Sequence, residues 1–159
     1  GAPPDAVRLR QQAVAELDPQ LQGKGLVYSS YLGGVSHDYT NAITVDGSGS
    51  AYISGDTSSR NFPVKSPYQA SLHGSQDAFL TVVDPSGAKL LYSTFLGGIY
   101  RDEGWGVVLG AEGAIYLSGE TNSPDFPTKD AYQSELAGDY DAFVFKFTVS
   151  GSTLPFKEK

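Results

Sequence analysis

The chain has 159 residues, of which 40 % are apolar, and this is enough for a packed core. A net charge of −7 and scattered basic residues exclude nucleic acid and anionic membrane surfaces as expected partners, and no apolar run is long enough for membrane insertion as a helix. The absence of Cys excludes disulfides, thiolate catalysis and Cys-ligated zinc.

Residues 1–25 are predicted to form a non-repeat N-terminal arm. Between Pro4 and Pro19, apolar residues recur at helical spacing, which predicts a short helix: Ala6, Leu9, Ala13 and Leu17. The alternative is a short strand through Val7 and Leu9.

The rest of the chain contains one sequence twice, 64 positions apart and without a gap. Residues 26–34, LVYSSYLGG, return at 90–98 as LLYSTFLGG. Roughly 25 of about 64 aligned pairs are identical, far above chance. We therefore predict two repeats, 26–89 and 90–154, each of which buries its apolar faces against its neighbours.

Each repeat contains short runs of β-branched and aromatic residues between Gly-rich turns, which predicts strands. The expected strands are 40–45, 51–55 and 77–83 in the first repeat, with equivalents at 104–109, 114–119 and 141–147. A fourth strand is expected at 89–96, and its sequence also occurs at 26–32. The predicted fold is an all-β propeller with two four-stranded antiparallel blades per chain.

Acidic residues in the loops have structural explanations. Asp46 begins a Gly-rich turn, and we expect an Asx-type turn rather than a calcium loop, because Thr57 stands where the terminal acid would be. Asp77 and Asp141 recur in both repeats and are expected to cap backbone N–H groups at a strand start. A structural calcium at the carboxylate pairs 102–103 and 139–141 is the alternative; we expect no metal and no cofactor.

The sequence contains only two histidines that could act as the base of a nucleophilic mechanism. His37 and His73 align with Arg101 and Ala137, so neither histidine belongs to the repeated scaffold. Because nucleophilic catalysis needs a base beside the nucleophile, we expect solvated loop histidines and no enzyme.

The pattern Tyr-Ser-Ser/Thr-Tyr/Phe-Leu-Gly-Gly, followed by Gly-x-Ala/Ile-Tyr-x-Ser-Gly, Phe-Pro, Tyr-Gln and Asp-Ala-Phe, resembles the bacterial SBBP-type β-propeller repeat. The resemblance covers about residues 26–154. It implies a propeller fold and an extracellular or cell-surface location, and it implies no reaction. The second repeat departs from the pattern at residues 110–112, where the family usually has an Asp.

The expected function is a non-catalytic binding module for a glycan or a protein; the alternative is a structural or assembly scaffold without a small ligand. Scaffold residues should recur, so unrepeated aromatic and charged side chains are the candidates for ligand contacts. We place them just before or at the start of the first strands: His37, Asp38, Tyr39, Arg101, Asp102, Glu103 and Trp105.

The strand order predicts self-assembly. The second repeat lacks its own fourth strand, because Pro155 interrupts the pattern and cannot donate to a ladder, whereas residues 26–32 are a spare copy of that strand. We therefore expect a closed homo-oligomer formed by strand exchange, with a trimer of six blades favoured and a dimer or tetramer as alternatives. The remaining alternative is that the sequence is part of a longer propeller.

Overall fold

The computed structural model describes residues 25–148, and the chain forms two units, Gly1–Ser30 and Tyr31–Lys159. Every described strand lies in the second unit. The predicted N-terminal arm lies outside the described residues except for Gly25, so its helix or strand stays a prediction.

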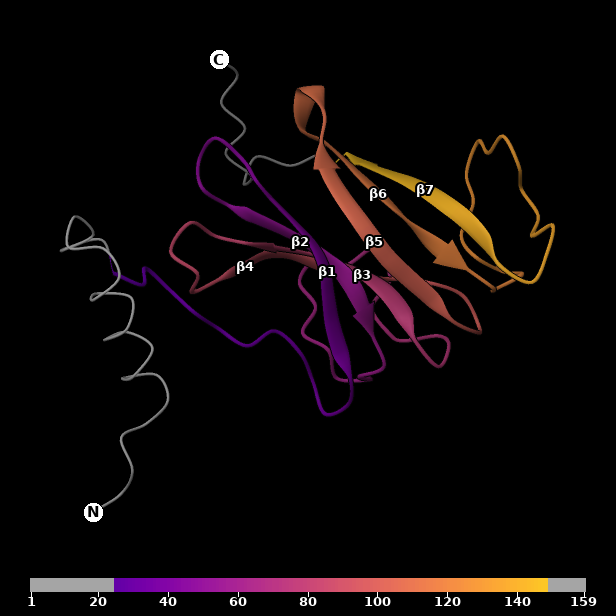
Figure 1. Cartoon of the computed structure of the whole chain (residues 1–159), viewed down its shortest axis with the longest axis horizontal. Coiled ribbons are helices and arrows are strands. Elements are labelled where there is room, and N and C mark those ends of the chain that lie inside the picture. The colour runs from indigo at the N-terminus through magenta and orange to yellow at the C-terminus, as the bar shows by residue number, and fades with distance from the viewer. Residues whose placement is uncertain (1–24, 149–159) are drawn as a thin grey trace. The chain divides into compact units, whose positions relative to one another are not determined.

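The first blade is a four-stranded antiparallel sheet that follows the chain order (Figure 1). Its strands are β1 (Asp38–Val45), β2 (Ala51–Thr57), β3 (Asp77–Val83) and β4 (Leu90–Leu96). The four predicted strands are therefore confirmed. β1 begins and β2 ends two residues beyond the prediction, since Asp38 pairs with Thr57 at the end of the ladder.

The second blade has three strands in the described part of the chain. They are β5 (Asp102–Leu109), β6 (Ala114–Thr121) and β7 (Asp141–Thr148), and the short 3-10 turn η2 (Ala111–Gly113) joins the first two. Three strands agree with the expectation that the second repeat lacks its own fourth strand, and the spare copy at 26–32 forms no strand. Nothing described pairs with the outer edge of β7, so a fourth strand in this blade stays a prediction. Within residues 25–148 both sheets are open and form no closed ring.

The larger core lies between the two blades, where β5 packs against the first sheet (Figure 1). The first blade contributes Tyr52, Leu80 and Val82 from one face, and all three are fully buried. The second blade contributes the opposing side chains Val107, Ile115, Leu117, Phe143 and Phe147. Burial of these apolar surfaces holds the blades together.

A second cluster lies on the other face of the first blade. Phe62, from the Phe-Pro signature, contacts the Phe79 ring at 4.6 Å and the Phe95 ring at 5.8 Å. In the second blade Phe126 and Phe143 form the same pair at 4.6 Å. The Phe-Pro element therefore packs the long loop onto β3 and β7 in the same way.

A β-bulge interrupts each inner strand at the same place. The register shifts between Thr40 and Ala42 in β1 and between Gly104 and Gly106 in β5, so that Asn41 and Trp105 are the extra residues. A bulge turns its extra residue away from the regular alternation of a strand. The bulges thus direct two unrepeated side chains toward the junction between the blades.

Candidate functional site

Each inner strand begins at a corner built around one aspartate. We call the turns at residues 33–38 and 97–102 the first and second corner. In the first, the Oδ2 atom of Asp38 accepts hydrogen bonds from the Gly34 N–H at 2.8 Å and the Ser59 hydroxyl at 3.0 Å. Asp102 makes the equivalent bonds in the second, with the Gly98 N–H at 2.8 Å and the Ser123 hydroxyl at 3.0 Å.

The equivalence of the two corners shows that two of the seven candidate residues were wrongly predicted to be unrepeated. Asp38 and Asp102 are 64 positions apart, so they are a repeated pair rather than unrepeated charges. Asp102 is fully buried, and burial raises the pKa of its carboxyl against the opposing hydrogen bonds from Thr121, Gly98 and Ser123. These two carboxylates hold the turns that lead into β1 and β5.

A hollow of about 460 Å³ lies where β1 and β5 meet, between the two blades. Its size falls within the range of small-molecule sites. Its lining is polar and aromatic: His37, Tyr39, Asn41, Asp56, Ser58, Gln76, Arg101, Glu103 and Trp105. Five of the seven predicted residues therefore come together here, and only the two corner aspartates do not.

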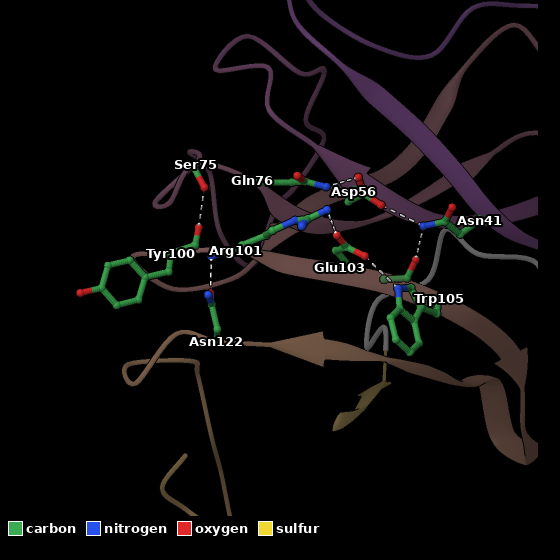
Figure 2. Close-up of polar contacts among 10 residues, drawn as sticks. Asn41, Asp56, Ser75, Gln76, Tyr100, Arg101, Glu103, Trp105 and Asn122 are labelled. Atoms are coloured by element: carbon green, nitrogen blue, oxygen red, sulfur yellow. Dashed lines mark hydrogen bonds and ion pairs between the residues drawn. The ribbon is translucent and has the colours of Figure 1, made fainter. Parts of the chain in front are cut away.

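The bulged Trp105 is half exposed at this hollow, with 51 % of its surface accessible. Its indole N–H donates to the Oε2 atom of Glu103 at 3.1 Å, and the other Glu103 oxygen pairs with the Arg101 guanidinium (Figure 2). Both oxygens of this carboxylate are therefore engaged, and the indole ring is held at a fixed orientation.

The other polar side chains form a network around Asp56. The Asn41 amide donates to the Asp56 Oδ1 at 2.8 Å and to the Gly104 carbonyl at 3.0 Å, so it links the two blades (Figure 2). The Gln76 amide donates to the second oxygen of Asp56. Burial raises the pKa of Asp56, and the negative charge of Glu103 adds to this rise against the hydrogen bond from Asn41.

A second aromatic surface comes from the first corner. The His37 and Tyr39 rings are stacked, with 6.2 Å between their centroids and 3° between their planes. Tyr39 is 55 % exposed, and the His37 carbonyl accepts the Ser58 N–H at 2.9 Å. The hollow therefore combines three aromatic side chains with a cation, two carboxylates and two amides.

Four lining residues were not predicted from the sequence. Asn41 could have been found from its alignment with Trp105, because a position that differs between repeats was the signal used for the others. Asp56 and Gln76 align with Glu120 and Tyr140 and carry the same signal. Ser58 aligns with Asn122, and this difference between two small polar residues is a weaker signal.

The structural roles predicted for the loop aspartates are confirmed. Asp46 accepts the Ser48 N–H at 2.8 Å and the Ser50 N–H at 3.0 Å, as in an Asx-type turn. Asp77 accepts the His73 and Gly74 N–H groups, at 3.0 and 3.1 Å. Across residues 25–148, no group of three or more His, Cys, Asp or Glu side chains is placed to hold a metal ion, and no helix there is long and apolar enough to span a membrane.

A family model matches part of the chain. Residues 27–63 match the family model of the SBBP β-propeller repeat. The match runs from the spare strand sequence through β1 and β2 to the Phe-Pro element. No curated protein matches the chain. An SBBP repeat suggests a binding or structural module.

Proposed function

We propose that the chain is a non-catalytic binding module of the cell exterior that recognises a glycan in the hollow between its blades. The observation that carries the proposal is the half-exposed indole of Trp105 beside the Arg101–Glu103 ion pair. A sugar ring has an apolar C–H face that packs on an aromatic ring and a rim of hydroxyls that need hydrogen-bond partners.

The polar lining supplies both kinds of partner. Arg101 can only donate hydrogen bonds and ionised Glu103 can only accept them, whereas an amide such as Asn41 does both. Sugar hydroxyls also donate and accept, so this mixture suits them better than a purely cationic or purely acidic site would. Tyr39 offers a second exposed ring for a longer glycan.

The arrangement of the two carboxylates supports binding rather than catalysis. Asp56 accepts hydrogen bonds from Asn41 and Gln76, one on each oxygen. Glu103 is engaged in the same way by Arg101 and Trp105. A general acid or base needs an oxygen directed at the reacting group, and here all four oxygens have side-chain partners.

The experiment is a glycan array probed with the wild-type chain and with two variants. We expect Trp105→Ala to abolish the signal and Tyr100→Ala to keep it. Tyr100 is a matched control because its exposed fraction is 53 %, against 51 % for Trp105, while its ring points away from the hollow (Figure 2). Retention of the signal by Trp105→Ala would contradict the site, and hydrolysis of a bound glycan would contradict the non-catalytic assignment.

An array without any signal would favour the second candidate, a structural or assembly scaffold. One observation supports that candidate on its own. Ile43 in β1 is 62 % exposed, whereas the equivalent Val107 in β5 is 6 % exposed because it packs against a neighbouring blade. The first blade therefore presents an apolar face of the kind that another blade covers.

A further inference from the structure

We propose that the second blade binds residues 26–33 of a second copy of this chain as its fourth strand. The acceptor is the outer edge of β7 and the groove beside it, which we call the strand groove. The groove has a volume of about 930 Å³ and lies between β7 and the loop of residues 121–136. This inference concerns assembly and does not depend on the glycan site.

The first blade shows what such a groove holds. There, β4 pairs along β3 and also bridges to the long loop on its other side, Lys65 to Ser93 and Gln69 to Phe95. The equivalent space in the second blade lies open beside β7, whose outer edge has no strand partner in the described chain. A row of unpaired backbone groups on a sheet edge is a template for a further strand.

The loop of the second blade already has the conformation that receives this strand. Gln69 donates to Asp77 at 2.6 Å, and its Oε1 atom accepts the Gly97 N–H at 3.0 Å, where β4 ends. Gln133 donates to Asp141 at 2.8 Å in the same way. The Oε1 atom of Gln133 has no partner within residues 25–148, and Gly33 is the residue equivalent to Gly97.

The aromatic packing is complete in the first blade and lacks one member in the second. Phe95 from β4 is 1 % exposed and completes the cluster of Phe62 and Phe79. The equivalent pair in the second blade, Phe126 and Phe143, is stacked, and no third ring from a fourth strand joins it in the part of the chain that the structure describes. The residue equivalent to Phe95 is Tyr31, whose side chain is fully exposed. Burial of this ring in the groove would contribute the apolar part of the binding energy.

The donor also keeps the hydroxyl groups that β4 uses. Ser93 donates to the Pro63 carbonyl at 2.7 Å, and the Thr94 hydroxyl accepts the Gln69 N–H at 2.9 Å. The equivalent donor residues are Ser29 and Ser30, and Pro127 is the residue of the second repeat equivalent to Pro63. The segment therefore matches the groove in its polar as well as its apolar positions.

The corners show to which blade the donor belongs. At the second corner, the strand that enters is β4, the outer strand of the preceding blade. The first corner holds Gly34 with the same hydrogen bond, 2.8 Å long, as the second holds Gly98. Residues 26–32 enter the first corner, so they are the outer strand of a blade that precedes the first. The second blade of another copy is such a blade, because the groove beside its β7 has the positions that residues 26–33 match.

The register follows from the first blade. Leu80 pairs with Thr94 in β3 and β4, so Val144 of one copy should pair with Ser30 of the next. Tyr31, one position further, should point to the opposite face of the sheet. Because the chain has no natural Cys, single cysteine variants can test this register directly.

The experiment mixes Val144→Cys protein with Ser30→Cys protein in a glutathione redox buffer. The matched control replaces Val144→Cys with Lys146→Cys, an exposed position two residues along β7 on the same face, so the donor segment is the same in both mixtures. We expect about tenfold more disulfide-linked two-chain product from the Val144→Cys mixture. Equal yields, or no linked product from Val144→Cys, would overturn the proposal.

Light scattering of the wild-type chain is independent of whether the variants fold. We expect a mass of three times 16.9 kDa, and twice or four times that mass also supports strand exchange with a different ring size. A monomer at micromolar concentration would overturn the proposal.

Discussion

The first and second blades have the same arrangement of their first three strands. They differ at the bulged residue of the inner strand and at the outer edge of the sheet. The Phe pairs have equal ring separations of 4.6 Å, and each corner aspartate holds its glycine N–H at 2.8 Å. The blades differ at the bulged residue, which is Asn41 in one and Trp105 in the other. Repeated residues thus build the blade, and divergent residues line the hollow between blades.

The two blades also differ at the outer edge of the sheet, next to β3 in the first blade and at β7 in the second. β4 pairs with the edge of β3, whereas no strand within residues 25–148 pairs with the outer edge of β7. The loop beside β7 keeps the Gln133–Asp141 hydrogen bond that corresponds to Gln69–Asp77. The inner faces differ in a related way, since Ile43 is exposed where Val107 is buried. Both differences lie at borders where no neighbouring blade is present within residues 25–148.

The largest expected effect tests whether the bulges are truly equivalent. A Cβ atom at Gly55 would lie 1.8 Å from the Tyr39 carbonyl oxygen, and one at Gly119 would lie 1.8 Å from that of Glu103. We expect Gly55→Ala and Gly119→Ala each to lower the free energy of unfolding by more than about 3 kcal/mol, because backbone must move. Urea unfolding measures this effect.

Gly47→Ala is the control for both variants, because a Cβ atom there meets no heavy atom within 4 Å. We expect a change below about 0.5 kcal/mol. If Gly119→Ala behaved like this control while Gly55→Ala did not, the two blades would not share the bulge geometry.

A smaller effect separates the two corners. Asp102→Ala leaves the Gly98 N–H and the Ser123 hydroxyl without their acceptor in a buried site, so we expect a loss of about 3 kcal/mol. Asp38 is only half-buried, and Asp38→Ala should lose about 1–2 kcal/mol because water can replace the carboxylate. Thermal or urea unfolding compares them, with exposed Asp139→Ala as a control; equal losses would show that burial does not distinguish the corners.

The pH dependence of stability tests the burial of the second corner. The pKa of Asp102 is raised above its ordinary value of 3.8, so the folded chain binds this proton more tightly than the unfolded chain does. The resulting stabilisation is complete below pH 3.8 and is lost as the pH rises through the raised pKa. The free energy of unfolding of the wild type should therefore fall relative to that of Asp102→Asn over this window.

Urea unfolding of both proteins at several pH values between about 4 and 7 measures this difference. Burial also raises the pKa of Asp77, which lies near Asp102 and is present in both proteins. Parallel stability curves would contradict a raised pKa at Asp102.

The strands of the blades could be predicted because their signals are local. Alternating apolar residues and Gly-rich turns gave β3 with its correct bounds, Asp77–Val83. The ends of β1 and β2 were missed because they depend on the pairing of Asp38 with Thr57, which connects two strands and leaves no pattern in either one.

The site could be predicted in part. Comparison of the two repeats pointed to His37, Tyr39, Arg101, Glu103 and Trp105, which the structure brings together. The bulges that direct Asn41 and Trp105 into the hollow could not be seen, because a bulge is a property of register between strands. Asp38 and Asp102 were wrongly assigned to the unrepeated residues, although their spacing of 64 positions makes them a repeated pair.

Trp105 stands where the first blade has Asn41, and in the function that we propose its indole forms the binding surface. Trp105 is the single Trp of the chain, so the emission of its indole reports on the hollow alone. The direct test is a fluorescence titration of the wild-type chain with a glycan that gives a signal on the array. We expect a saturable change in emission over the same range of glycan concentration as the binding measured by calorimetry. Calorimetric binding without any change in the emission of Trp105 would contradict it.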